Sequence, residues 1–347
     1  MHTNNSKIDV VIPACYPDDK IKKLVEMLSR QTVAVSQVII VNTVPNAMAT
    51  DSVDTVLYNA EQRIRDCEKI EGIKVTTSKV YEDEFDHGGT RNRGALLASD
   101  DCEFLLFMTQ DAVPMDDRLI KSLVAKFDDE SVAAAYARQM PAENSSISEQ
   151  FTRGFNYPDI DQVKSLEDIE TMGIKAFFCS NVCAMYRRSV FISLGQFINR
   201  TIFNEDMVFA NKLLKNGYKI AYAKDAKVIH THEYTGMQQY RRNFDLAVSQ
   251  VLNPQAFSGI SSESEGLKYV KAAFLYFLKA KKPLEIIPFG IKCVYKYMGY
   301  RKGKKVLSLS KKEIYKATSN ARFFEKLPVG NEMLEYVLRV NQIDIKE

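Results

Sequence analysis

A glycine-rich turn in this chain has the residue types that bind a diphosphate. Residues 85–95 read Phe-Asp-His-Gly-Gly-Thr-Arg-Asn-Arg-Gly-Ala; they follow a strand-like run at 73–80 and open a helix-like run at 90–99. Adjacent glycines, beginning at Gly88, allow a sharp turn and a close approach of the backbone to a ligand. The amides of the following helix N-terminus, together with Arg91, suit a diphosphate.

A single carboxylate, Asp111, follows the next apolar run, Phe104 to Met108. The carboxyl end of a buried strand is where a hard metal ion can meet phosphate oxygens. Taken alone, the glycine turn is also typical of an ordinary strand-to-helix connection, and Asp111 of a turn or helix cap. The order of turn, Arg-Asn helix, apolar strand and Asp favours a nucleotide-sugar site.

Alternating strand and helix patterns surround these residues and predict an α/β fold. Such alternation implies right-handed crossovers and a mostly parallel sheet with helices on both faces. Residues 144–170 are polar and show little periodicity, so we interpret them as a loop over the site. The expected strands are 8–13, 38–41, 73–80, 104–111, 132–138 and 218–228, and the expected helices are 18–30, 53–70, 90–99, 116–127 and 203–217.

Composition indicates an ordinary folded protein of the cytoplasm. The 347 residues are 46% hydrophobic and 26% charged. The longest apolar run, 272–278, is far shorter than the roughly 20 residues that cross a bilayer. The six cysteines lie in or beside apolar or helix-like segments, so we expect reduced thiols. Cys179 and Cys183 lack a second pair at zinc spacing.

Charge divides the chain into two parts. Residues 268–326 carry sixteen Lys or Arg and three acids, so the rest of the chain must carry a net charge of −10 to reach the total of +3. Ser- and Gly-rich residues at 254–264 indicate the boundary. We therefore expect a catalytic domain over residues 1–250 and a basic, mainly helical region over 251–347.

The spacing of these features resembles the family 2 glycosyltransferases of the GT-A fold. The resemblance covers about residues 8–245, and His-Gly-Gly-Thr-Arg-Asn at 87–92 is similar to the rhamnosyltransferase branch. It implies a Rossmann-like GT-A domain with a central, mostly parallel sheet, a nucleotide-sugar donor and Mg²⁺ or Mn²⁺ as cofactor.

The resemblance also implies a general base. Relatives carry an acidic pair where this chain has Glu205 and Asp206, and their Asp takes the proton of the acceptor hydroxyl. We therefore expect Asp206 to be the base and Glu205 to support it or to contact the acceptor. Without the resemblance, acids at a helix start are commonly explained by the helix dipole.

The metal site departs from the family pattern. The family's acidic cluster often reads Asp-X-Asp, whereas here Thr109 and Gln110 precede a single Asp111. A second ligand is therefore needed, and related enzymes place a His at the end of a late strand. His230 and His232 are two residues apart, which puts both side chains on one face of a strand. At least one of them is expected to join Asp111 at the metal.

Recognition of the nucleoside is expected at the first two strand ends. Residues 13–17, Pro-Ala-Cys-Tyr-Pro, resemble the family's base and ribose site. Most relatives place an Asp after the second strand, where this chain has Asn42, whose amide can still bind a base. The residues expected at the donor are Pro13, Ala14, Asn42, Gly88, Arg91, Gln110 and Asp111.

The resemblance implies an inverting glycosyltransferase that transfers L-rhamnose from dTDP-rhamnose to a growing polysaccharide or a lipid-linked acceptor, such as a polyprenyl-diphosphate glycan. Another nucleotide sugar is the first alternative. A nucleotidyltransferase is a second, although the chain lacks an early Gly-rich, Lys- or Arg-bearing loop. A non-enzymatic binder of anionic polymers or membranes would explain residues 268–326 but would leave Asp111 and Asp206 without a role.

The basic region has two interpretations. On a helical wheel four lysines fall within roughly 80° of one another, beside an apolar arc of about 100°. The apolar arc could pack on the catalytic domain, or the surface could lie on anionic lipid at the inner face of the membrane. Nucleic acid is not expected, since no recognition module accompanies the charge. The lysines are Lys268, Lys271, Lys279 and Lys282, and the apolar arc is Leu267, Val270, Phe274, Phe277 and Leu278.

Overall fold

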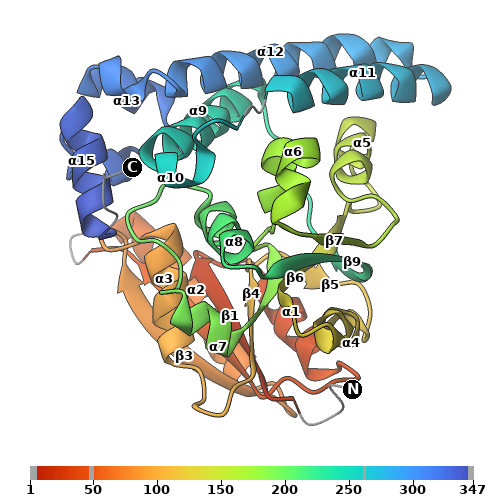
Figure 1. Cartoon of the computed structure of the whole chain (residues 1–347). Coiled ribbons are helices and arrows are strands. Elements are labelled where there is room, and N and C mark those ends of the chain that lie inside the picture. The colour runs from red at the N-terminus through yellow and green to blue at the C-terminus, as the bar shows by residue number, and fades with distance from the viewer. Residues whose placement is uncertain (1–5, 47–50, 261–262, 343–347) are drawn as a thin grey trace.

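The computed structural model describes residues 6–46, 51–260 and 263–342, and its centre is a twisted sheet (Figure 1). Within these residues the sheet has nine strands in the order β3-β2-β1-β4-β8-β6-β9-β5, and β7 also pairs with β9. The strands are β1 (Ile8–Cys15), β2 (Gln37–Val44), β3 (Lys74–Tyr81), β4 (Phe104–Met108), β5 (Val113–Pro114), β6 (Val132–Met140), β7 (Gln162–Lys164), β8 (Cys183–Arg187) and β9 (Lys219–Ile229).

The first four strands form the parallel sheet that the alternating pattern predicted. β1 pairs in parallel with β2 and with β4, and β2 pairs in parallel with β3. β8, which the sequence showed only as an apolar stretch, runs antiparallel to both β4 and β6. Beyond it β6 and β9 are again parallel. The carboxyl ends of β1, β2, β4, β6 and β9 therefore meet at one edge of the sheet.

Helices cover both faces of the sheet, and each face has its own core. Successive residues of β1 alternate between them: Val10 and Ile12 pack in one core and Val11 in the other. The first core includes α1 (Lys20–Ser29), α2 (Asp51–Glu68) and α4 (Leu119–Val124). The second core includes α3 (His87–Leu96), α7 (Arg188–Ser193) and α8 (Glu205–Lys215).

The interpretation of residues 144–170 as a loop is wrong. This segment holds α5 (Ile147–Asn156), β7 and α6 (Ile169–Met172). Ser146 caps α5 by accepting a hydrogen bond from the Glu149 amide, and Phe151 packs against helices far along the chain. The helix was missed because its stability comes from that tertiary contact and only a few of its residues are apolar.

The C-terminal region is helical, as expected. α9 shares a core with the last helices, since Phe244 and Val248 pack with Val306, Phe324 and Val337. The elements are α9 (Gly236–Leu252), α10 (Pro254–Phe257), α11 (Glu263–Lys279), α12 (Ile286–Gly303), α13 (Lys311–Ala317), α14 (Ala321–Glu325) and α15 (Asn331–Val340).

α12 crosses α9 at unusually close range, and glycines make this possible. A Cβ atom on Gly299 would lie 2.1 Å from the Tyr240 carbonyl oxygen, and one on Gly303 would lie 2.3 Å from that of Phe244. A Cβ atom on Gly236 would lie 2.6 Å from Cδ2 of the Tyr295 ring. Any side chain at these positions would push the two helices apart.

Two expectations from composition can be compared with the structure. All six cysteines are free thiols. In the part of the chain that the structure describes, none of the helices combines the length and apolar character needed to cross a bilayer.

Candidate active site

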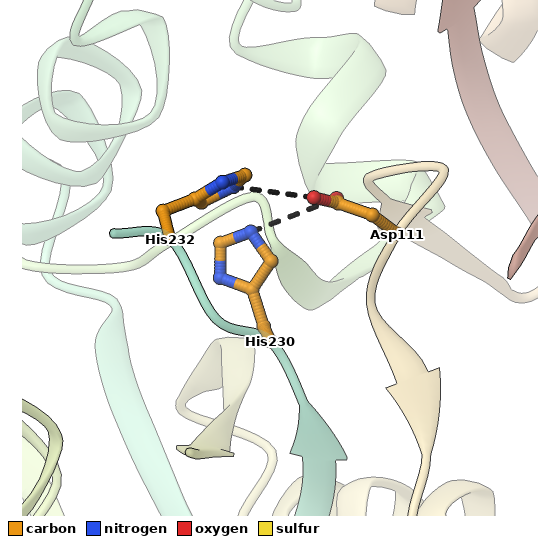
Figure 2. A group of neighbouring side chains, drawn as sticks. All are labelled: Asp111, His230 and His232. Carbon is orange, nitrogen blue, oxygen red and sulfur yellow. Dashed lines mark ion pairs between the residues drawn. The ribbon is translucent and has the colours of Figure 1, made fainter. Parts of the chain in front are cut away.

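Asp111, His230 and His232 come together beyond the strand ends (Figure 2). β5 pairs with β9 so that Val113 faces Ile229, which brings the residues just before β5 beside those just after β9. His230 Nε2 lies 3.6 Å from Asp111 Oδ1, and His232 Nε2 lies 3.2 Å from Asp111 Oδ2. One ligand atom from each residue falls within 4.8 Å of the others. The sequence predicted this convergence from the strand ends.

Gln139, at the end of β6, determines how His230 presents its ring. Arg153 donates a hydrogen bond to Gln139 Oε1, so this atom must be the amide oxygen. His230 Nδ1 lies 2.9 Å from the same oxygen and must therefore carry the proton. The unprotonated Nε2 of His230 is left facing Asp111, which is the arrangement that metal-ligating histidines adopt.

The donor set fits a divalent cation. Burial lowers the pKa of His230 to about 3, against the opposing effect of Asp111, so the ring is a neutral ligand at physiological pH. One carboxylate oxygen and two imidazole nitrogens form a mixed set, and imidazole is a better ligand for Mn²⁺ than for Mg²⁺. Among the described residues, no other group of three His, Cys, Asp or Glu has this geometry, and Cys179 and Cys183 take no part.

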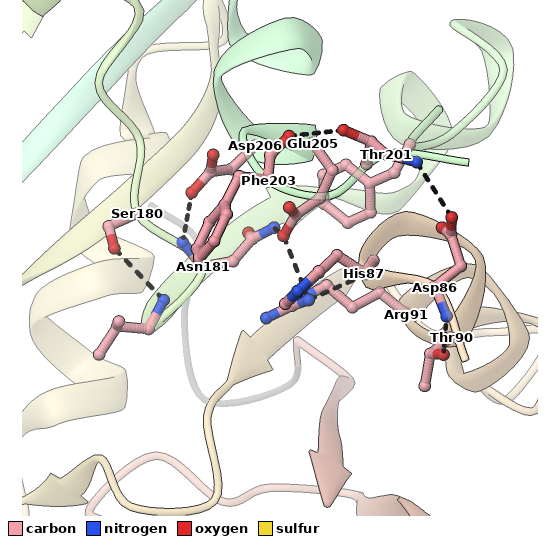
Figure 3. Close-up of polar contacts among 12 residues, drawn as sticks. Asp86, His87, Thr90, Arg91, Ser180, Asn181, Thr201, Phe203, Glu205 and Asp206 are labelled. Atoms are coloured by element: carbon pink, nitrogen blue, oxygen red, sulfur yellow. Dashed lines mark hydrogen bonds and ion pairs between the residues drawn. The ribbon is translucent and has the colours of Figure 1, made fainter. Parts of the chain in front are cut away.

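The acidic pair lies at the start of α8 (Figure 3). Asn204 precedes it in the left-handed conformation, with φ of 64°, which turns the chain sharply into the helix. Glu205 is buried, and its Oε1 lies 3.1 Å from Arg91 Nη1. Asp206 Oδ2 accepts a hydrogen bond from the Asn181 amide at 3.2 Å, and Oδ1 accepts one from the Met207 amide at 2.7 Å.

The two carboxyl groups of the pair have opposite proton affinities. Burial is the largest single effect and acts to raise the pKa of Glu205, but the Arg91 guanidinium, His87 and the hydrogen bond from Asn181 together hold this pKa below its usual range. Burial and the negative charge of Glu205 raise the pKa of Asp206 to about 7. Two adjacent carboxyl groups with separated pKa values are typical of an acid–base site, and a base is most effective near the working pH.

One short segment connects the metal cluster with the acidic pair. Gln139 Nε2, on the amide that holds His230, lies 3.1 Å from Ser180 Oγ. The next residue, Asn181, binds both acids: its amide N–H donates to Asp206 and its side-chain Nδ2 donates to Glu205 at 3.2 Å. Tyr186 in turn donates to Asn181 Oδ1 at 2.9 Å. The two groups thus belong to a single site.

The glycine-rich turn begins a helix, and its first glycine lies tightly against another segment of the protein. α3 starts at His87, with Asp86 as N-cap accepting a hydrogen bond from the Gly89 amide at 2.7 Å. A Cβ atom on Gly88 would lie 1.9 Å from the carbonyl oxygen of Ile198. The need for glycine at this position therefore comes from the chain segment before α8.

Arg91 also has a different contact from the one we predicted. Its guanidinium is buried, binds Glu205 and donates a hydrogen bond to the His87 carbonyl at 2.9 Å. In this geometry it holds the acidic pair. The ring of His87 stacks on Phe203 with centroids 5.3 Å apart.

The residues expected at the nucleoside lie at the ends of β1, β2 and β4. Gln110 binds both backbone groups of Cys15, accepting from its amide at 2.8 Å and donating to its carbonyl at 3.1 Å, and so fixes the strand end that contains Pro13 and Ala14. Asn42 is buried, and its Oδ1 has no hydrogen-bond partner among the described residues. An unpaired buried amide oxygen costs about 1–3 kcal/mol, so a ligand donor there would be favourable.

Sequence reasoning missed Gln139, Arg153 and Asn181. Gln139 lies near the end of β6 and Asn181 just before β8, where a polar residue beside an apolar strand is the one signal that could have indicated them, whereas Arg153 lies within α5 and had no such signal. Their partners lie 14 to 91 residues away in the sequence, so their roles became visible only in the fold.

Comparison with known proteins places the chain in a family. Residues 9–195 match the family described as glycosyl transferase family 2. The O-antigen chain rhamnosyltransferase WbaN of Salmonella anatum is 39% identical over 233 residues, which are 66% of this chain and 73% of the relative. RfbN of Salmonella typhimurium (strain LT2), also an O-antigen chain rhamnosyltransferase, is 33% identical over 312 residues, covering 87% and 91% of the two chains.

The chain belongs to glycosyl transferase family 2. This family 2 enzyme is therefore a glycosyltransferase, and its fold is the GT-A arrangement expected from the resemblance. Solved structures to which the chain shows some similarity include a mannosyltransferase of Pyrobaculum calidifontis in complex with GDP-Man and Mn²⁺, at 13% identity and a TM-score of 0.49 over 97% of this chain and 87% of that one. Residues 1–349 of S. aureus TarS in complex with UDP-GlcNAc give 14% identity and a TM-score of 0.46 over 97% and 90%.

Proposed function

We propose that this protein transfers L-rhamnose from dTDP-rhamnose to a lipid-linked or growing polysaccharide acceptor, with inversion at the anomeric carbon. The observation that carries the proposal is the connection of two groups by Gln139, Ser180 and Asn181: a metal-type cluster, and a carboxyl pair in which the pKa of Asp206 is raised. The choice of sugar is supported by the two O-antigen rhamnosyltransferases that the chain resembles over most of its length.

Asp206 is the proposed base. The acceptor hydroxyl oxygen forms a bond to the anomeric carbon as the bond from that carbon to the diphosphate oxygen breaks. The hydroxyl proton passes to Asp206, whose pKa of about 7 lets it hold and release a proton near neutrality. A single displacement of this kind converts a β-linked donor into an α-linked product. Glu205, fixed by Arg91 and Asn181, keeps its negative charge beside the base.

Asp111, His230 and His232 are the proposed metal ligands. Mn²⁺ fits their mixed oxygen and nitrogen set better than Mg²⁺. The ion would supply positive charge to the departing diphosphate. Donor contacts are proposed for the strand ends at Pro13, Ala14, Asn42 and Gln110, with the unpaired Asn42 Oδ1 as the first candidate for a nucleoside hydrogen bond.

A different nucleotide sugar is the alternative within the same family. Near the carboxyl end of β2 this chain has Asn42, where an acceptor-only Asp would select a base more narrowly, so the base preference rests on the two relatives.

The experiment is a transfer assay with a panel of donors. Purified protein is incubated with dTDP-rhamnose, UDP-galactose, UDP-N-acetylglucosamine or GDP-mannose, each with Mn²⁺, Mg²⁺ or a chelator, and released nucleotide and glycan product are measured. Metal-dependent release from dTDP-rhamnose and an α-anomeric signal in the product's NMR spectrum are expected. Preference for another donor, or retention of the β configuration, would contradict the proposal.

A further inference from the structure

The helices α11 and α12 form an antiparallel pair at one end of the molecule, farthest from α1 and α4 (Figure 1). We call this pair the C-terminal hairpin, residues 263–303. Its inner side packs on the catalytic region: Phe277 and Phe289 are buried with Phe151 of α5, and Tyr269 shares a hydrogen bond with Thr152 at 2.7 Å. Its other side has no helix or strand lying over it in Figure 1.

The outer side of the hairpin is apolar, so packing on the catalytic domain accounts for only part of the arc of Leu267, Val270, Phe274, Phe277 and Leu278. Of these only Phe277 is buried, whereas Leu267 is 76% exposed and Phe274 is 48% exposed. α11 therefore keeps an apolar stripe in contact with solvent.

α12 carries a matching stripe. Ile287, Ile291, Val294 and Met298 recur at helical spacing and are all more than half exposed, and Leu284, in the connection between the helices, is 82% exposed. Single exposed apolar side chains are ordinary, but stripes on two neighbouring helices, together with their connection, indicate an interaction surface.

Positive charge borders these stripes. Residues 263–305 contain eleven Lys or Arg and three acids. Lys271 and Lys279 are exposed beside the stripe of α11, Lys282 lies exposed in the connection, and Arg301 is exposed at the end of the stripe of α12. Tyr297 is exposed at the margin, and tyrosine is favoured where apolar and aqueous phases meet. Apolar residues bordered by lysines match an anionic lipid surface, with the stripes in the acyl region and the ammonium groups at the head groups.

The hairpin also borders the active site. A cavity between them is lined by His232 and Tyr234 on one side and by Tyr269, Phe289, Lys292 and Lys296 on the other. A surface bound to the outer side of the hairpin would thus be separated from the metal cluster by a single layer of helices, the hairpin itself.

We propose that the outer side of the C-terminal hairpin binds the surface of an anionic lipid bilayer and thereby brings the active site to a lipid-linked acceptor. The acceptor part of this inference rests on the proposed function, whereas the lipid contact itself does not. A second copy of the chain is the competing occupant, and charge decides against it, because two copies of the same basic surface would repel each other.

Vesicle co-sedimentation of the full-length protein tests the contact. One set of vesicles is phosphatidylcholine, and the other contains about one third phosphatidylglycerol, which provides an anionic surface potential. Binding to the anionic vesicles is expected at low salt, with at least a tenfold weaker partition coefficient at high salt or on neutral vesicles, on the order of what screening of a few lysines predicts. Equal binding to both vesicle types, or to neither, would overturn the proposal.

Three variants separate charge, apolar contact and general effects of substitution. A charge variant (Lys271→Glu, Lys279→Glu, Lys282→Glu) and an apolar variant (Phe274→Asn, Leu278→Asn, Ile291→Asn) should each reduce the partition coefficient by about tenfold or more. A matched control carries Lys22→Glu, Lys23→Glu and Lys121→Glu on exposed positions of α1 and α4 and should bind like the unaltered protein. Equal loss in the control would show a non-specific charge effect and contradict the assignment to the hairpin.

Two further measurements complete the test. Sedimentation velocity without lipid should give the same monomeric or oligomeric state for the unaltered protein and the apolar variant; loss of a dimer in the variant would assign the stripes to a protein interface instead. Transfer to a water-soluble acceptor should be unchanged in the charge and apolar variants. If the protein binds vesicles but does not use dTDP-rhamnose, the proposed function fails and the lipid contact stands.

Discussion

Gln139 accepts a hydrogen bond from Nδ1 of His230 at 2.9 Å, across 91 residues of sequence. Because Arg153 donates to the same oxygen, the amide cannot be rotated to present its nitrogen, and the tautomer of His230 is fixed. The imidazole nitrogen that faces Asp111 is thereby kept as an electron-pair donor before any cation arrives.

This contact predicts that Gln139→Leu weakens metal binding. The leucine side chain fills the site but cannot accept the hydrogen bond from His230 Nδ1, so His230 is free to rotate or change tautomer. The dissociation constant for Mn²⁺, measured by electron paramagnetic resonance of the free ion, should rise by about 10- to 100-fold. An unchanged constant in a variant that still melts cooperatively would contradict the role of Gln139.

Asp111→Asn is expected to abolish the effect of metal on donor binding. The amide keeps the volume of the side chain but removes the anionic oxygens that lie beside both histidines. In thermal shift measurements the unaltered protein should melt at a higher temperature with dTDP-rhamnose and Mn²⁺ than with either alone. Asp225→Asn, a change on an exposed residue of β9, serves as control; a full metal-dependent shift in Asp111→Asn would exclude this carboxylate as a ligand.

Asp206→Asn should reduce turnover by a factor on the order of 10² or more, since an amide cannot take the proton of the acceptor. Donor affinity should change little, because the base contacts the acceptor. Turnover and donor dissociation constants measured on the same preparation distinguish the two effects. If Asp206→Asn keeps full turnover and Glu205→Gln loses it, the base is the other carboxyl group.

The dependence of rate on pH follows from the raised pKa of Asp206. A base acts only when it is deprotonated, so kcat/KM should rise with pH up to about 7 and then level off. Glu205→Gln removes the neighbouring negative charge that helps to raise this pKa, and the rising limb should move to lower pH. If kcat/KM of Glu205→Gln rises over the same pH range as that of the unaltered protein, a group other than Asp206 titrates.

Arg91→Met tests the buried ion pair separately from catalysis. Removing the guanidinium leaves the Glu205 carboxylate buried without its positive partner, which typically costs about 3–5 kcal/mol of the free energy of unfolding. Urea denaturation of the variant should show this loss, and Arg91→Met combined with Glu205→Gln should recover much of it. Equal stability of the single and double variants would mean that the pair contributes little to the fold.

The parts of the fold and site that could be predicted from sequence are those with local signals. β1 and β2 are mostly apolar runs. Asp111 follows an expected strand, and the family resemblance placed a histidine of the pair His230 and His232 with it, so their meeting could be expected before the fold was known. The direction of β8 carried no such signal, because an apolar run looks the same in a parallel and an antiparallel strand.

Sequence alone could not name the protein contacts of Gly88 and Arg91, because it identifies a chemical group but not the atom that lies near it. Gly88 was correctly singled out as a position that needs glycine, yet the atom it approaches is the Ile198 carbonyl oxygen. Arg91 was correctly expected to meet an anion, and the anion is Glu205, 114 residues later. Residues 144–170 looked unstructured because the partners of Phe151 lie in α11 and α12.

The close crossing of α9 and α12 has a consequence for which acceptors can react. Gly299 and Gly303 bring the two backbones together so tightly that the hairpin cannot tilt against the catalytic region without breaking this contact. If the hairpin rests on lipid, the height of Asp206 above the bilayer is then fixed by the structure. An acceptor must hold its reactive hydroxyl at that height. The protein would therefore select glycans by the length between their lipid end and their growing tip.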